Sequence, residues 1–227
     1  MKNLYKYIFA AMLTLTTATS CSDFLDESPK GVIDEEKAFS RPDEMVTSAY
    51  AMLGDCWYSY PFNLWPYGDL SSDDCLKGGS GTTDTGYHPM EIWSTMTSTS
   101  GEFDELWYRL YCAVSRCNRA LLSLEQRIAE VKFLRAHFYF KLITMFRQVP
   151  WIDENVTKNN LQEQTRNDEF TYEQLFGKII ADFKEAYDVL PEVQKDKNRA
   201  NKIAAASYLA KCYLTLAYGD GYEATNG

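Results

Sequence analysis

Aromatic rings stand beside short acids in the segment NLWPYGDLSSDD at residues 63–74. This segment places Trp65 and Tyr67 next to Asp69 and Asp73, and Trp93 lies on the return path toward the next helical pattern. Glycans present flat patches of C–H groups that stack on aromatic faces, while carboxylates accept hydrogen bonds from their hydroxyls. Such a site needs rings with open faces and polar groups beside them. The pattern therefore predicts a sugar-binding surface made by Trp65, Tyr67, Asp69, Asp73 and Trp93.

Two other interpretations of this region stay open. The acids Asp69, Asp73 and Asp74 could instead hold calcium, although the spacing of an EF-hand loop is absent. The aromatic residues that directly follow the first helical segment could pack over its end. These residues are Trp57, Tyr58, Tyr60 and Phe62.

Catalysis finds little support in the sequence. The chain contains no G-x-S-x-G turn, no H-E-x-x-H pair, no P-loop and no glycine-rich dinucleotide turn. His137 lies in the apolar stretch RAHFYFKL, where we expect a core histidine. The adjacent Asp73 and Asp74 are more typical of solvated or ion-binding side chains than of a glycosidase pair. We therefore expect a protein that is not an enzyme and that carries no cofactor.

The N-terminus has the features of a bacterial lipoprotein precursor. Residues 1–20 combine Lys2 and Lys6 with a short apolar run and small residues before Cys21, which predicts a signal peptide and lipid on the Cys21 thiol. The alternative is an ordinary signal peptide cleaved near Ser20. Cleavage before Cys21 would remove these two lysines. The number of Lys and Arg residues then falls from 23 to 21 against 32 acidic residues, which gives the mature chain a net charge of −11. This balance disfavours nucleic acid as a partner.

The cysteine pattern supports neither a disulfide framework nor a zinc site. With Cys21 lipidated, five cysteines remain, an odd number that excludes complete internal pairing. Cys112 and Cys117 fall on different faces of one helical segment, so they should not bridge, whereas a Cys56–Cys75 pair stays open. The spacings match no zinc pattern, and the chain has two histidines.

The pattern of the rest of the chain predicts an all-α fold. Residues 21–39 form an acidic tether, and an aperiodic, aromatic-rich loop occupies residues 55–100. Apolar residues at helical spacing predict helices over residues 41–54, 103–124, 128–146, 172–190 and 201–218. Capping boxes are expected at Ser40–Asp43 and at Thr171–Gln174, and Asn201 should cap the last helix. The stretch 128–146 is apolar on more than one face, which indicates a helix buried between neighbours.

The last four helices suggest two antiparallel hairpins stacked in a tetratricopeptide-like manner. No capping helix follows residue 218, so we expect the last helix to present an uncovered apolar face and the chain to be truncated. Such a fold would also suit a helical-repeat scaffold protein without its own ligand site. A scaffold, however, has no need of Trp65 and Trp93 exposed together.

Several segments together resemble the SusD/RagB family of nutrient-binding lipoproteins. In chain order they are CSDFLDESP at 21–29, the helix with Trp107, Tyr111, Val114, Cys117 and Asn118, EVKFLRAHFY at 130–139, FRQVP at 146–150, the helix with Ile179, Asp182, Phe183, Ala186, Leu190 and Pro191, and RANKIAAASYLAKCYL at 199–214. The ordered set covers most of residues 21–216.

This resemblance implies a surface lipoprotein of the outer membrane that captures glycans beside a SusC-like TonB-dependent transporter. It also implies that residues 40–227 are the incomplete N-terminal helical domain of a protein more than twice this length. In the family the segment before the Trp107 helix contributes to the ligand surface, but no motif there assigns a binding residue by position. The resemblance implies a lipid anchor at Cys21 and a glycan ligand.

Overall fold

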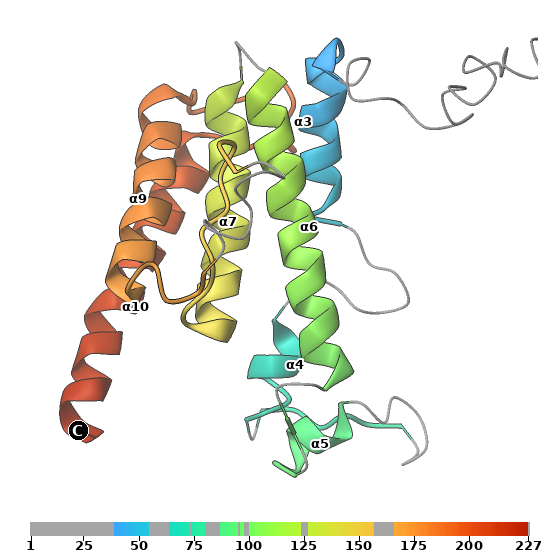
Figure 1. The fold of residues 1–227 in the computed structure, drawn as a ribbon, viewed down its shortest axis with the longest axis vertical. Helices are drawn as coiled ribbons and strands as arrows, with labels where there is room; N and C mark the ends of the chain where they lie inside the picture. The colour runs from blue at the N-terminus through green and yellow to red at the C-terminus, as the bar shows by residue number, and fades with distance from the viewer. Residues whose placement is uncertain are drawn as a thin grey trace, which may run out of the picture. The chain divides into compact units, whose positions relative to one another are not determined.

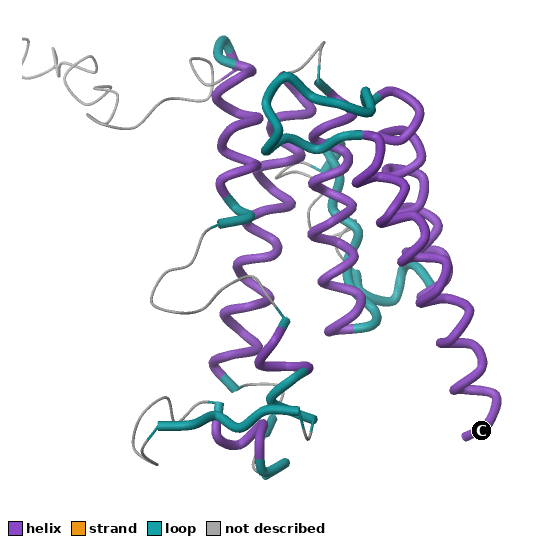
Figure 2. Tube along the Cα trace, turned by 180° about the vertical axis from the view of Figure 1, so that it is seen from behind, coloured by secondary structure: helices purple, strands orange, loops and turns teal. Residues whose placement is uncertain are grey.

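The computed structural model describes residues 39–54, 64–72, 74–79, 87–94, 96–97, 100–123, 127–156 and 166–226, the last eight of these by their backbone alone. The signal peptide, Cys21, residues 22–38 of the acidic tether, residues 55–63 and Asp73 therefore lie outside the described residues. The regular structure within the described ranges is entirely helical (Figure 2), which confirms the predicted all-α fold.

Five long helices build the described unit. They are α3 (Pro42–Ala51), α6 (Gly101–Ser123), α7 (Ile128–Phe146), α9 (Tyr172–Val189) and α10 (Lys202–Asn226). Figure 1 shows α6 and α7 as one antiparallel pair and α9 and α10 as the next, with α3 against α6. Helix α7 contacts all four of the other long helices. The predicted stacking of helical hairpins is therefore confirmed.

Helix α7 is the centre of the core because apolar side chains surround it. Leu134, Phe138 and Leu142 are completely buried on one face of the helix, and so are Ala136 and Ile143 on another. A helix with one apolar stripe would leave an exposed polar face, whereas α7 is covered by neighbours on both flanks. The prediction of a buried helix over 128–146 is confirmed to the residue.

Local capping explains where two helices begin. The Gln174 N–H donates to Thr171 Oγ1 at 3.3 Å, and the Thr171 N–H donates back to Gln174 Oε1 at 2.8 Å. The Ala204 N–H donates to Asn201 Oδ1 at 2.9 Å. Both predicted caps are confirmed, because each satisfies amide groups that a helix start leaves without partners.

Three expectations about elements were wrong. Arg41, not Ser40, stands at the N-cap of α3 without a side-chain cap bond, and Asp43 pairs with Arg127 at 2.9 Å instead of closing a box. The segment expected to be a loop contains two one-turn helices, α4 (Trp65–Gly68) and α5 (His88–Glu91). Helix α10 continues past the predicted end at residue 218 to Asn226. Two glycines in this extension lower the helix propensity by about 1 kcal/mol each, but they do not prevent the helical backbone hydrogen bonds.

One face of α10 is apolar and exposed, as predicted for this helix. Ala205 and Cys212 are completely buried against α7 and α9, whereas Ile203, Tyr213, Leu214 and Tyr218 are exposed to solvent. Within the described residues we find no helix with the length and apolarity needed to cross a bilayer.

Candidate functional site

A cleft opens beside the N-terminal end of α6, where Figure 1 places α4 and α5. Its volume is about 430 Å³, which lies within the range of sites for small molecules. We call it the α4–α5 cleft. It is lined by Tyr67, Ser71, Pro89, Met90, Trp93, Met96, Phe103 and Met145. Two of the five predicted binding residues, Tyr67 and Trp93, are thus brought together at one cleft.

Both the hydroxyl and the ring of Tyr67 contact the first turn of α6. Its hydroxyl donates to the carbonyl oxygen of Glu102 at 2.8 Å, and its ring centroid lies 5.4 Å from that of Phe103. The completely buried Leu70 anchors the turn that follows α4. Tyr67 therefore forms a rigid wall of the cleft.

Trp93 has the most open aromatic face of the described aromatic residues of the predicted site. Its side chain is 79% exposed and its φ is +53°, in the left-handed region that bulky residues rarely adopt. The Ser94 N–H donates to the Pro89 carbonyl at 3.1 Å, which closes the turn around Trp93, and the buried Met90 anchors α5. Such backbone strain costs about 1–3 kcal/mol and clusters at ligand sites.

The other predicted binding residues lie elsewhere. Trp65 is 39% exposed and packs against Tyr87, with ring centroids 6.4 Å apart, and it does not line the cleft. Residues two apart on a helical turn point about 200° apart, so the α4 turn directs Trp65 away from Tyr67. Asp69 is exposed outside the cleft lining, and Asp73 lies outside the described residues.

The cleft also contains residues that sequence reasoning missed. Met90, Met96 and Met145 supply thioethers from α5, from the segment after it and from the end of α7. Methionine adapts its shape to ligands, so it is common at binding surfaces. Met145 and Phe103 fit the helical stripes expected of core residues, and no spacing in the sequence relates them to residues 87–96.

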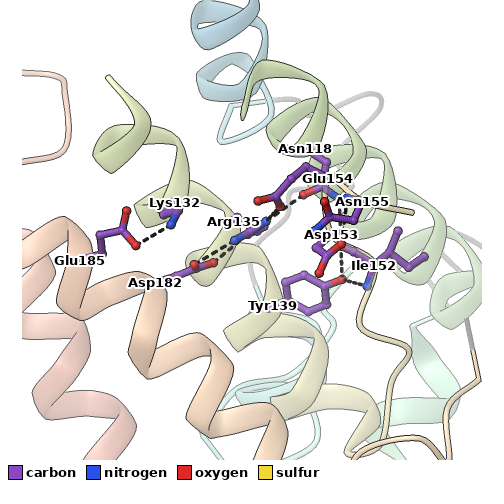
Figure 3. Close-up of polar contacts among 10 residues, drawn as sticks. All are labelled: Asn118, Lys132, Arg135, Tyr139, Ile152, Asp153, Glu154, Asn155, Asp182 and Glu185. Atoms are coloured by element: carbon purple, nitrogen blue, oxygen red, sulfur yellow. Dashed lines mark hydrogen bonds and ion pairs between the residues drawn. The ribbon is translucent and has the colours of Figure 1, made fainter. Parts of the chain in front are cut away.

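Arg135 forms a network of hydrogen bonds and ion pairs away from the cleft, between α6, α7 and α9 (Figure 3). Arg135 donates from Nε to Asp182 Oδ2 at 2.7 Å and from Nη2 to Oδ1 at 2.9 Å. Its Nη1 donates to Asn118 Oδ1 at 3.3 Å and pairs with Glu154. Burial alone would lower the pKa of Arg135, but the bonds and charge of Asp182, followed by those of Glu154, outweigh it and raise the pKa. Arg135 is therefore a buried arginine whose charge is paired within the protein.

This arginine cluster fixes the connector after α7. Tyr139 OH donates to the Ile152 carbonyl at 2.9 Å and accepts from the Ile152 N–H at 2.6 Å (Figure 3). Asn118 Nδ2 donates to the same carbonyl at 2.8 Å, and Trp151 stacks on Tyr139 with centroids 4.1 Å apart. The polar groups of this cluster form hydrogen bonds between different segments of the chain, so we assign the cluster a structural role.

Most of the remaining candidates for chemistry lie in the core or pack against it. Burial, followed by the charges of Lys141 and Lys211, lowers the pKa of His137 to about 3, and its Nε2 is buried without a hydrogen-bond partner. Trp107 packs on Phe146, with ring centroids 5.0 Å apart. Cysteines 75, 112, 117 and 212 are free. The residues that the structure describes include no cluster of His, Cys, Asp and Glu able to hold a metal.

Comparison with known proteins relates the whole helical unit to one family. A family model described as "Starch-binding associating with outer membrane" matches residues 23–214. The chain is similar to SusD-like protein P2 of Formosa agariphila, with 27% identity over 92% of this chain and 43% of that protein. It is also similar to a SusD-like protein of Bacteroides ovatus, with 26% identity over 89% of this chain and 38% of that protein.

Solved structures agree on the fold. A laminarin-binding SusD-like protein superposes with a TM-score of 0.65 and 22% identity over 80% of this chain and 41% of that one. Surface glycan-binding protein A from Bacteroides fluxus gives a TM-score of 0.63 and 22% identity over 81% of this chain and 41% of that one. The chain thus spans about two fifths of the length of these relatives.

Proposed function

Because the chain belongs to the SusD-like family of starch-binding proteins that associate with the outer membrane, we propose that it binds glycans at the cell surface for import. The observation that carries this proposal is the α4–α5 cleft, which joins the exposed ring of Trp93 to the fixed ring of Tyr67. A sugar ring stacks its C–H face on the open indole while its edge enters the cleft beside Tyr67. The names of two structural neighbours, one laminarin-binding and one glycan-binding, support the same class of ligand.

This function requires no catalytic group. The buried carboxylates Asp182 and Glu130 are engaged by Arg135 and Arg199, and His137 is neutral in the core. We therefore propose that the protein binds its ligand and leaves it chemically unchanged.

Native gels containing neutral polysaccharides test the proposed binding. The acidic chain, with a net charge of −9 over the full sequence, disfavours anionic glycans, so the panel should include starch, laminarin, xylan and galactomannan. We expect at least one of these to retard the protein relative to serum albumin in the same gel. Equal mobility in all four gels would contradict glycan binding by this chain.

We further propose that Cys21 carries lipid and anchors the protein to the outer membrane. The cleft can meet external glycans only if the chain is exported, and the small residues before Cys21 support lipidation. Palmitate labelling in cells should mark the wild type and Cys75→Ala but not Cys21→Ala. Equal labelling of the Cys21→Ala variant would contradict the anchor.

The partner in import is proposed to be a SusC-like TonB-dependent transporter. A binding protein held at the surface by lipid needs a channel that accepts the captured glycan, because none of the described helices spans a membrane. A gene for such a transporter beside the gene for this chain, and co-purification of the two proteins from outer membranes, would support this step.

One observation favours a second function, that of an interaction scaffold. The exposed apolar face of α10, with Ile203, Tyr213, Leu214 and Tyr218, is suited to cover another helix. A scaffold of this kind would use α10 and would have no use for the α4–α5 cleft. Loss of glycan binding on substitution of cleft residues would therefore separate the two functions.

A further inference from the structure

The walls of the α4–α5 cleft are far less polar than a fully hydroxylated sugar. Three of the chain's seven methionines line it, together with Pro89 and Phe103. Met90 is 4% exposed, so the inner wall is formed by a buried thioether. These side chains offer C–H and sulfur surface and no strong hydrogen-bond donor.

The hydroxyl groups of Ser71 and Tyr67 on the cleft wall already donate hydrogen bonds within the protein. Ser71 Oγ donates to the carbonyl oxygens of Tyr67 at 3.1 Å and Pro66 at 3.4 Å. Tyr67 OH donates to the carbonyl oxygen of Glu102 at 2.8 Å. Among the lining side chains that the structure describes, the indole N–H of the exposed Trp93 is the remaining donor. The oxygen of a hydroxyl buried against the methionines would therefore lose, without replacement, the hydrogen bonds that water donates to it.

We infer that the α4–α5 cleft selects glycans that carry a methyl-bearing substituent over the same glycans with a hydroxyl in its place. This inference rests on the proposed glycan binding and specifies its ligand class. A methyl group suits the thioether wall, while the rest of the sugar remains at the open mouth beside Trp93. Two kinds of glycan supply such a group: 6-deoxy sugars, through their C6 methyl, and acetylated glycans, through the acetyl methyl. Starch, which the family description names, carries neither.

Matched pairs of sugars test the preference and identify the source of the methyl group. One pair is L-rhamnose and L-mannose, which differ by the hydroxyl at C6. The other is acetylated xylo-oligosaccharides and the same material after removal of acetyl groups by alkali. We expect the methyl-bearing member of at least one pair to bind about fourfold more tightly, the equivalent of roughly 0.8 kcal/mol for one buried carbon group.

The binding is read from the ¹³C-methyl resonances of methionine in the full chain. Resonances of Met90, Met96 and Met145 should shift, and that of Met52, which is buried in the core on the C-terminal side of α3, should not. The variant Met145→Gln, which adds an amide of similar size, should bring the ratio within each pair close to one. A Met145→Leu variant is the matched control and should keep the preference.

Two results would overturn the inference. Equal affinity within both pairs, with shifts at the cleft methionines, would remove the preference and leave glycan binding in place. Unchanged methionine resonances with all four sugars would show that the cleft does not receive the substituent. The polysaccharide gels then decide separately whether the chain binds glycans at all.

Discussion

Replacement of Arg135 by alanine should destabilise the helical unit by about 3–5 kcal/mol, the range measured when one partner of a buried ion pair is removed. The Arg135 side chain is 5% exposed and makes a two-bond pair with Asp182, whose side chain is 8% exposed. Without Arg135 the buried Asp182 carboxylate loses its ion-pair partner, and Asn118 and Glu154 lose a partner as well. Urea unfolding followed by helical circular dichroism measures the change.

Lys132→Ala is the matched control because Lys132 also joins α7 to α9, through Glu185. The Glu185 side chain is 48% exposed, so water screens this pair and its loss should cost less than about 1 kcal/mol. A free energy of unfolding for Arg135→Ala within 1 kcal/mol of the wild type would contradict the structural role of the cluster.

The long helices could be predicted because their signals are local. The apolar stretch 128–146 gave the bounds of α7, and the Thr171–Gln174 pair gave the start of α9. Periodicity and capping act over a few residues, so a single sequence contains them. The pairing of Arg135 with a carboxylate could also be expected, since a charged side chain in a buried helix needs a partner.

The identity of that partner, and the composition of the cleft, could not be predicted. Asp182 lies 47 residues from Arg135, and Met145 reaches the cleft from the far end of α7. Contacts of this kind depend on how hairpins stack, which no short spacing encodes. The one-turn helix α4 also separates Trp65 from Tyr67, two residues that a loop would have allowed to share a surface.

Trp93→Ala should weaken glycan binding about tenfold or more. Loss of one stacked ring costs on the order of 1–3 kcal/mol, by analogy with bases stacked on aromatic side chains. Trp93 is the most exposed residue of the cleft lining, and its strained backbone holds the indole at the mouth. Because the side chain is 79% exposed, its removal should leave the helical circular dichroism unchanged. Isothermal titration with a polysaccharide that retards the wild type measures the affinity.

Trp65→Ala is the control that separates the cleft from the aromatic segment as a whole. The sequence alone predicts equal losses for both tryptophans, whereas Trp65 packs on Tyr87 outside the cleft lining and should lose less than about threefold. Equal, large losses in both variants would extend the ligand surface from the cleft across α4. Wild-type affinity in both would contradict a binding role for this region. A loss confined to Trp93→Ala assigns binding to the cleft, because the two variants remove the same ring from neighbouring elements and differ in whether that ring faces the cavity.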